Sequence, residues 1–291
     1  MRAAPPTRRW YRRAKPGLGT LVEIAVLASS EAEFMRASDH AFERIAAFHA
    51  AMSFHAPGSD LAAIAAAPAG TTVSVAAETW RVLRFALALE AESDRIFNVA
   101  VAPRLVARGA LPAPRSATPV EALAGSAGAA LQLESGSRVR VRNAVWIDLG
   151  GIAKGAAVDA ALAAIRSAGA ASGCVHAGGD IAVYGADAQP IHVRGPAPAR
   201  LLVDVGLLRD GAIATSAPGE DATRPAPLVL PAGRTARWGD RSVSVVAPSC
   251  LVADALTKVL AALGPEAAPL LGKHDARGFS IDVQGRLERV G

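Results

Sequence analysis

Hydrophobic residues recur at helical spacing in several long segments of the chain. Phe34, Ala41, Ile45 and Phe48 lie three, four or seven positions apart, so that a helix would place them on one face. This pattern predicts a long helix over Glu31–Met52. Similar patterns predict further helices over Ala77–Ser93, Gly155–Ala168 and a segment that ends at Gly264, with a short helix after the Pro57-Gly58 pair.

Runs of β-branched residues bounded by glycine or proline predict strands between these helices. The predicted strands are Thr20–Leu27, the segment around residues 130–141, an apolar strand that begins at Val145, and runs within residues 173–185, 191–217, 242–249 and 279–290. Helices and strands intermingle without a strict βαβ order, and the G-x-G-x-x-G pattern is absent. We therefore expect a mixed α+β fold with one compact domain over residues 16–291, not a Rossmann fold.

Composition agrees with a globular protein. The chain has 291 residues, of which 51% are hydrophobic, and this is enough to bury a large core. Its charged fraction of 20% excludes general disorder. Charges or prolines interrupt every apolar run well before the length of a bilayer-spanning helix, so no membrane span is expected.

Positive charge is concentrated at the start of the chain. Residues 1–15 hold six basic side chains and no acidic one, whereas the whole chain carries only +5. We expect these residues to form a flexible basic arm exposed to solvent, and we do not expect a nucleic-acid partner. No apolar segment of the kind found in signal peptides follows the arginines, which favours a cytoplasmic protein.

The cysteines and histidines indicate no zinc site. Cys174 and Cys250 lie in apolar surroundings and are expected to be buried, and no Cys-x-x-Cys pair is present. His176 is the one histidine beside a candidate site, next to a Gly-Gly-Asp sequence. A structural role is the more economical interpretation of this side chain.

The segment Val145–Ile165 carries the strongest chemical signal. A β-branched run meets Asp148, a Gly-Gly pair, Lys154 and a third glycine, and a helical pattern follows at once. A strand, a glycine turn and a helix start together direct backbone N–H groups and a positive dipole end toward a phosphate. Lys154 would add a full positive charge. An ordinary strand–turn–helix junction remains the alternative, because the glycine spacing alone is weak evidence.

A second candidate lies on the helix that ends at Gly264. Thr257 and Lys258 follow Asp254 by three and four residues, and such positions share a helix face. A carboxylate and a hydroxyl at this spacing would suit a magnesium ion that also binds phosphate oxygens. The alternative is an exposed Asp–Lys pair with little effect on stability.

The ordered set of segments resembles the ApbE family of FAD:protein FMN transferases. PGLGTLVEIAV is similar to an opening motif with Met-Gly-Thr, and MSFHAPGSDL resembles a Met-Ser-Thr-Tyr-x-Pro-x-Ser-Glu loop. FNVAVAPRL is similar to Phe-Asp-Pro-Thr-Val-Gly-Pro-Leu, and IDLGGIAKGAAVD matches the family almost letter for letter. HAGGDIAVYG, IHVRGP, AIATSA and SVSVVAPSCLVADAL continue the match, so the resemblance covers residues 16–290.

This resemblance implies a transferase that cleaves the pyrophosphate of FAD, transfers FMN to a threonine hydroxyl of an acceptor protein and releases AMP. FAD is then the substrate and Mg²⁺ the cofactor. The resemblance implies catalytic roles for Asp254 and Lys258 and metal binding by Gly151, Asp254 and Thr257. The implied flavin-nucleotide contacts are Leu18, Phe54, Phe97, Asn98, Asp148 and Lys154.

Several departures from the family pattern fall at positions that matter for chemistry. The family has a second metal-binding side chain, a threonine, four residues after the aspartate, and Lys258 stands there in this chain. The ammonium of Lys258 could occupy the place of the cation. Asn98 replaces an aspartate and Ala100 a threonine, while Pro227 and Leu230 stand where a histidine and an aspartate are expected.

Three functions remain open from the sequence. The first is an active FMN transferase, or at least an FAD pyrophosphatase, with an altered metal centre. The second is a flavin-binding protein without catalytic activity on the same scaffold. The third is a scaffold without flavin that binds another partner through its basic arm.

Overall fold

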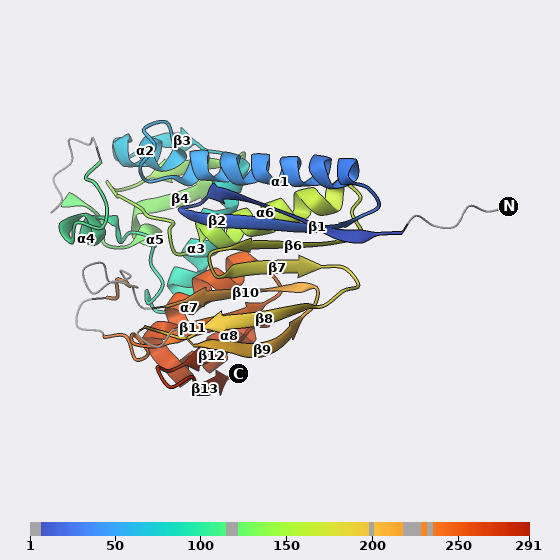
Figure 1. Ribbon diagram of the computed structural model, residues 1–291. Helices are drawn as coiled ribbons and strands as arrows, with labels where there is room; N and C mark the ends of the chain where they lie inside the picture. The colour runs from blue at the N-terminus through green and yellow to red at the C-terminus, as the bar shows by residue number, and fades with distance from the viewer. Residues whose placement is uncertain (1–6, 115–121, 198–200, 218–227, 232–234) are drawn as a thin grey trace.

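An eight-stranded antiparallel sheet organises the molecule (Figure 1). The computed structural model describes residues 7–114, 122–197, 201–217, 228–231 and 235–291. In spatial order the strands of this sheet are β1 (Arg9–Gly17), β2 (Thr20–Ala28), β6 (Ser172–Ala177), β7 (Asp180–Tyr184), β10 (Gly211–Ser216), β11 (Ser242–Ala247), β12 (Arg277–Ile281) and β13 (Leu287–Val290). Each strand is antiparallel to its neighbours.

Helices pack against one face of this sheet. The helices are α1 (Glu31–Met52), α2 (Asp60–Ala66), α3 (Ala77–Glu92), α4 (Ala102–Ala107), α5 (Ala127–Ala130), α6 (Ala153–Ser167), α7 (Cys250–Leu263), the 3₁₀ helix η2 (Gly264–Ala267) and α8 (Ala268–Lys273). Helix α1 packs on α6, α6 on α7, and α7 on strands β10 and β11. Among the described residues, no helix combines the length and the apolarity that crossing a bilayer requires.

Two smaller sheets complete the fold. Strands β3 (Thr72–Ser74), β5 (Arg138–Val141) and β4 (Leu131–Glu134) form one of them, in that order. The ribbon of β8 (Gln189–Arg194) and β9 (Leu202–Leu208) forms the other. Apolar side chains of this ribbon, such as Ile191, pack with Val183 and Phe279 of the large sheet. The ribbon therefore covers part of the sheet face opposite to the helices (Figure 1).

The mixed α+β fold expected from the sequence is confirmed. The helix predicted over Glu31–Met52 has those bounds, and Ser30 caps it by accepting a hydrogen bond from the Glu33 N–H. Phe34, Ile45 and Phe48 are buried on its inner face, as their spacing predicts. Helix α3 also agrees with its prediction within one residue at its end.

The prediction of a strand that begins at Val145 is wrong. No strand is assigned between residues 142 and 152. Val145, Ile147 and Leu149 are fully buried, and the Asp148 N–H donates one backbone hydrogen bond to the Val99 carbonyl at 2.8 Å. The apolar run therefore reflects burial in the core, since its backbone joins no continuous ladder.

The basic arm predicted over residues 1–15 is also corrected. Residues 9–15 belong to β1, and residues 1–6 lie outside the described part of the chain. Tyr11 stacks on Phe34 with ring centroids 5.4 Å apart, and Arg13 contacts Asp39 at 2.7 Å. Strand pairing with β2 and these contacts hold the charged residues on the sheet, an arrangement that a count of charges does not reveal.

Candidate functional site

Helices α6 and α7 approach each other closely at Gly155, in the first turn of α6. A Cβ atom at this position would lie 2.3 Å from the carbonyl oxygen of Cys250 and 2.8 Å from the Cβ of Asp254. A side chain larger than hydrogen cannot occupy that space. The third glycine of the motif therefore permits the contact between the two segments that the sequence marked as candidates.

Asp254 lies at this contact, and both of its carboxylate oxygens have partners. Its Oδ2 accepts a hydrogen bond from the Gly155 N–H at 3.1 Å, which satisfies one of the free donors at the start of α6. Its Oδ1 forms an ion pair with the ammonium of Lys258. Burial alone would raise the pKa of Asp254, but Lys258 and then Lys154 outweigh it and hold the pKa below its ordinary value.

The hydroxyl of Thr257 is engaged inside the protein. It donates to the Asp254 carbonyl oxygen at 2.7 Å and lies 2.8 Å from the hydroxyl oxygen of Ser216, at the end of β10. The whole residue is buried. Thr257 thus links α7 to the large sheet.

Lys154 reaches a carboxylate that the sequence analysis did not select. Its Nζ lies 3.2 Å from Oδ2 of Asp180, the first residue of β7. Burial and the negative charge of Asp254 raise the pKa of Asp180. Burial by itself would lower the pKa of Lys154, but the carboxylates of Asp180 and Asp254 outweigh it and raise that pKa.

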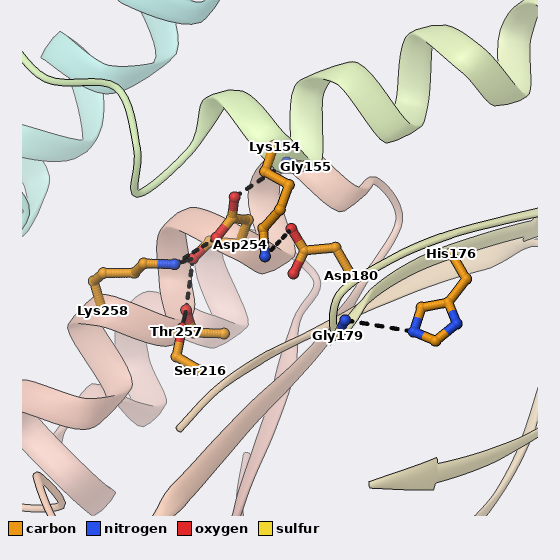
Figure 2. A network of polar contacts seen from close by, with 9 residues as sticks. All are labelled: Lys154, Gly155, His176, Gly179, Asp180, Ser216, Asp254, Thr257 and Lys258. Atoms are coloured by element: carbon orange, nitrogen blue, oxygen red, sulfur yellow. Dashed lines mark hydrogen bonds and ion pairs between the residues drawn. The ribbon is translucent and has the colours of Figure 1, made fainter. Parts of the chain in front are cut away.

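The turn before Asp180 explains its position. Gly178 has φ of +56°, and a Cβ atom there would lie 2.6 Å from the Thr20 hydroxyl oxygen. The β6–β7 hairpin can therefore turn tightly beside β2 and place Asp180 under the start of α6. His176 lies apart from the charged groups in Figure 2, where its Nε2 accepts from the Gly179 N–H at 3.4 Å.

Two carboxylates and two ammonium groups thus form one cluster around the first turn of α6 (Figure 2). The side chains of Asp180 and Asp254 are each only 1% exposed, whereas those of Lys154 and Lys258 are 27% and 23% exposed. Buried carboxylates of this kind require paired charges. The lysine side chains therefore form the exposed side of the cluster, and each ammonium is paired with a buried carboxylate.

A cavity of about 480 Å³ opens beside this cluster. One part of its wall is polar and includes Asp148, Gly150, Gly151 and Lys258. The rest is mostly apolar, and its larger side chains include Leu105, Val229, Trp238 and Val243. This volume lies in the range of small-molecule sites, and the lining is typical of them.

Asp148 stands at the polar part of the wall. Its Oδ2 accepts from the Gly150 N–H at 3.2 Å, and burial raises its pKa although that hydrogen bond opposes the shift. Phe97 and Asn98 also line the cavity. Both polar ends of the Asn98 side chain are engaged nearby, by the Gly125 carbonyl and the Ala100 N–H.

Leu18 and Phe54 are not among the residues that line the cavity. Leu18 occupies the β1–β2 turn with φ of +53° and faces a separate hollow between that turn and α1. The ring of Phe54 makes an edge contact with His55, at 6.3 Å between centroids. Their roles toward a flavin stay predictions.

The donor set does not fit the magnesium ion that was predicted at Gly151, Asp254 and Thr257. The ammonium of Lys258 lies against Oδ1 of Asp254, where a cation would have to lie. Oδ2 accepts from the Gly155 N–H, and the Thr257 hydroxyl contacts Ser216. Within the described ranges, no three His, Cys, Asp or Glu side chains come together as a metal site. Magnesium prefers carboxylate oxygens, and an ammonium beside the one carboxylate of this set repels a divalent cation.

At Leu230 an apolar side chain stands where the family pattern has an aspartate. This side chain is buried in the core, and the Leu230 carbonyl oxygen accepts from Arg104 at 2.6 Å. Pro227, where the family pattern has a histidine, lies outside the described residues.

Sequence reasoning missed two kinds of residue at this site. Asp180 follows a Gly-Gly pair and could have been found from the matching HAGGDIAVYG segment. Trp238 and Arg241 line the cavity from a stretch without periodicity, and the Arg241 guanidinium lies 5.5 Å from the Trp238 ring centroid. A local pattern contains no signal for these two.

Comparison with solved structures supports the same fold. The crystal structure of the ApbE protein from Thermotoga maritima has a TM-score of 0.78 at 25% identity, over 97% of each chain. The apo flavinyl transferase ApbE from Pseudomonas stutzeri has a TM-score of 0.79 at 20% identity, over 97% of this chain and 95% of that one. The flavin transferase ApbE from Vibrio cholerae has a TM-score of 0.79 at 20% identity, over 98% of each.

No curated protein sequence matches the chain. The sequence model of one family, described as the ApbE family, matches residues 18–279. That span includes the glycine motif, the Gly-Gly-Asp turn and the Asp254–Lys258 pair. The chain therefore belongs to the ApbE family.

Proposed function

We propose that the protein is an FAD:protein FMN transferase. The observation that carries the proposal is Lys258, which Asp254 holds at the start of α6 and which lies at the polar wall of an otherwise apolar cavity. Family membership supports it, as do the flavin transferases among the similar structures. We further propose that its partners are FAD and an acceptor protein that carries the target threonine.

The cavity matches the chemistry of FAD. A diphosphate needs positive charge and N–H donors, and the ammonium of Lys258 at the polar wall, with Lys154 behind it, would supply them. Aromatic ring systems need an apolar wall, which Trp238 and Val243 would provide. Asp148 would accept a hydrogen bond from a base or ribose group near the same turn.

The proposed reaction exchanges one phosphate ester bond for another. The threonine oxygen forms a bond to the FMN phosphorus, and the phosphoanhydride bond to AMP breaks. AMP leaves with the electron pair as a phosphate anion, and the hydroxyl proton leaves with a base. Such transfers depend on an in-line arrangement and on positive groups that face the growing negative charge.

Each charged residue then has a distinct task. Lys258 would contact the diphosphate oxygens, because it lines the cavity, and Lys154 would approach them from beside Asp180. Asp254 would hold Lys258 in place through its Oδ1 and fix the start of α6 through its Oδ2. In this chain Asp254 acts on the substrate through Lys258.

Incubation of the purified protein with FAD and a threonine-bearing acceptor tests the proposal. We expect the protein to stay yellow after gel filtration has removed free FAD, the acceptor to become fluorescent on a denaturing gel, and AMP to be released in an amount equal to the label. A threonine-to-valine acceptor is the matched control and should remain unlabelled.

The other functions give different results in the same assay. AMP release without labelling of the acceptor indicates an FAD pyrophosphatase. Yellow protein without AMP indicates a flavin-binding protein that does not catalyse the transfer. If neither colour nor AMP is seen, the flavin assignment is wrong.

A further inference from the structure

The ion pair between Lys258 and Asp254 has a consequence for how this chain binds a diphosphate. The ammonium of Lys258 contacts both Oδ1 of Asp254 and, at 3.1 Å, its main-chain oxygen. An ammonium has three N–H donors. Two are used on Asp254, and no acceptor for the third is found among the residues that the structure describes.

The stem of Lys258 lies against the glycine turn. A Cβ atom on Gly151 would lie 3.4 Å from Cε of Lys258 and 3.8 Å from its Cγ, so the lysine stem lies along the turn. Both residues line the cavity. The ammonium is therefore held between the carboxylate of Asp254 and the space beside Gly151.

The charges around this point leave no role for a second cation. Lys258 neutralises Asp254, and Lys154 is paired with Asp180. A divalent ion placed here would meet two ammonium groups and a carboxylate whose oxygens are already bonded. A phosphate oxygen would meet attraction from the ammonium of Lys258.

We propose that the ammonium of Lys258 takes the place of a divalent metal, so that this protein binds the diphosphate of its nucleotide without magnesium. The inference rests on the proposed function for the identity of the ligand as FAD. Lysine is a compact point charge that binds phosphate well. Held by Asp254, the ammonium of Lys258 can still donate a hydrogen bond to a phosphate oxygen beside Gly151.

The first test compares FAD binding by the wild-type protein in EDTA and in magnesium, followed by the change in flavin fluorescence. We expect dissociation constants that agree within about twofold, because the cation is part of the chain. Binding that is lost in EDTA and restored by magnesium would overturn the proposal. This comparison needs no variant, so misfolding cannot obscure it.

The second test uses Lys258→Thr, which removes the ammonium and offers a hydroxyl four residues after Asp254. We expect this variant to bind FAD at least about tenfold more weakly in EDTA and to regain binding with magnesium. Lys273→Thr is the matched control, because Lys273 is an exposed lysine paired with Glu92 on α3 and does not line the cavity. It should behave as the wild type in both buffers.

A third measurement separates this inference from the proposed function. Mn²⁺ is titrated into each protein without nucleotide, and free Mn²⁺ is measured by its paramagnetic resonance signal. We expect Lys258→Thr to bind Mn²⁺ at Asp254 and the wild type to leave it free. The inference would be overturned if the wild type bound Mn²⁺, or if Lys258→Thr failed to bind it. Both results can be obtained even when FAD does not bind to either protein.

Discussion

The main-chain N–H of Gly155 donates to Oδ2 of Asp254 at 3.1 Å, across 99 positions of sequence. This bond connects the glycine motif on α6 to the acidic helix α7. It also explains why the two candidate segments form one site. A carboxylate at the N-terminal end of α6 is favoured by the positive end of the helix dipole.

Gly155→Ala should disrupt this contact. The added methyl group would collide with the Cys250 carbonyl, so α6 and α7 must separate. We expect the free energy of unfolding to fall by about 1–3 kcal/mol, as measured by urea denaturation. FAD binding should weaken as well, because Asp254 would move away from the start of α6 and carry Lys258 with it.

Gly272→Ala is the matched control for that variant. Gly272 lies in α8, and a Cβ atom there would meet nothing within 4 Å. Alanine is a better helix former than glycine, so stability should be unchanged or slightly higher. Equal losses in the two variants would contradict the role given to Gly155.

Asp254→Ala should abolish AMP production. Lys258 would lose the carboxylate that holds it, and the first turn of α6 would lose a hydrogen-bond acceptor. Removing one member of a buried ion pair should also lower the free energy of unfolding by about 3 kcal/mol. Release of AMP from FAD, followed by chromatography, measures the first effect.

Asp254→Asn separates fold from charge in that experiment. The amide keeps the shape and can still accept from Gly155, but it no longer neutralises Lys258. We expect a folded protein with much reduced turnover. AMP production at the wild-type rate in both variants would show that the reactive centre lies elsewhere.

Lys154→Met should weaken FAD binding by about tenfold or more, since it removes a charged donor to phosphate and leaves Asp180 without its partner. A fluorescence titration with FAD gives the dissociation constant. Lys154→Arg keeps the charge and should retain most of the affinity. Equal affinity of Lys154→Met and the wild type would exclude Lys154 from the diphosphate site.

Asp159 should make stability depend on pH. Its carboxylate accepts from the N–H groups of Cys250 and Leu251 at 2.8 and 2.9 Å. Burial raises its pKa from 3.8 to about 6, helped by the charge of Asp254 and opposed by these two hydrogen bonds. Between those values the folded state holds a proton that the unfolded state has released.

The folded protein should therefore lose stability relative to Asp159→Asn as the pH rises from about 4 to about 6. Below this window the aspartic acid is protonated in both states, and above it the full cost of burying the charge is present. Urea denaturation of both proteins at four pH values measures the difference. A difference that does not change with pH would contradict the shifted pKa.

Local patterns in the sequence were sufficient for most elements of the fold. The periodic apolar residues of α1 and the glycine that ends α7 predicted those helices, because each depends on contacts within a few residues. The pattern failed at Val145–Leu149 and at residues 9–15. Burial and strand pairing are decided there by distant segments, which no local pattern records.

The chain by itself specified the residue types of the site: glycines at the start of a helix, Lys154 beside them, and Asp254 with Lys258 one helical turn apart. Only the tertiary structure decided which charges meet. It brought Lys154 to Asp180, buried Asp254 with the lysine that helical spacing already placed beside it, and set the hydroxyl of Thr257 against Ser216. The physical reason is that ion pairing depends on distance in space, and the close approach at Gly155 sets that distance for residues far apart along the chain.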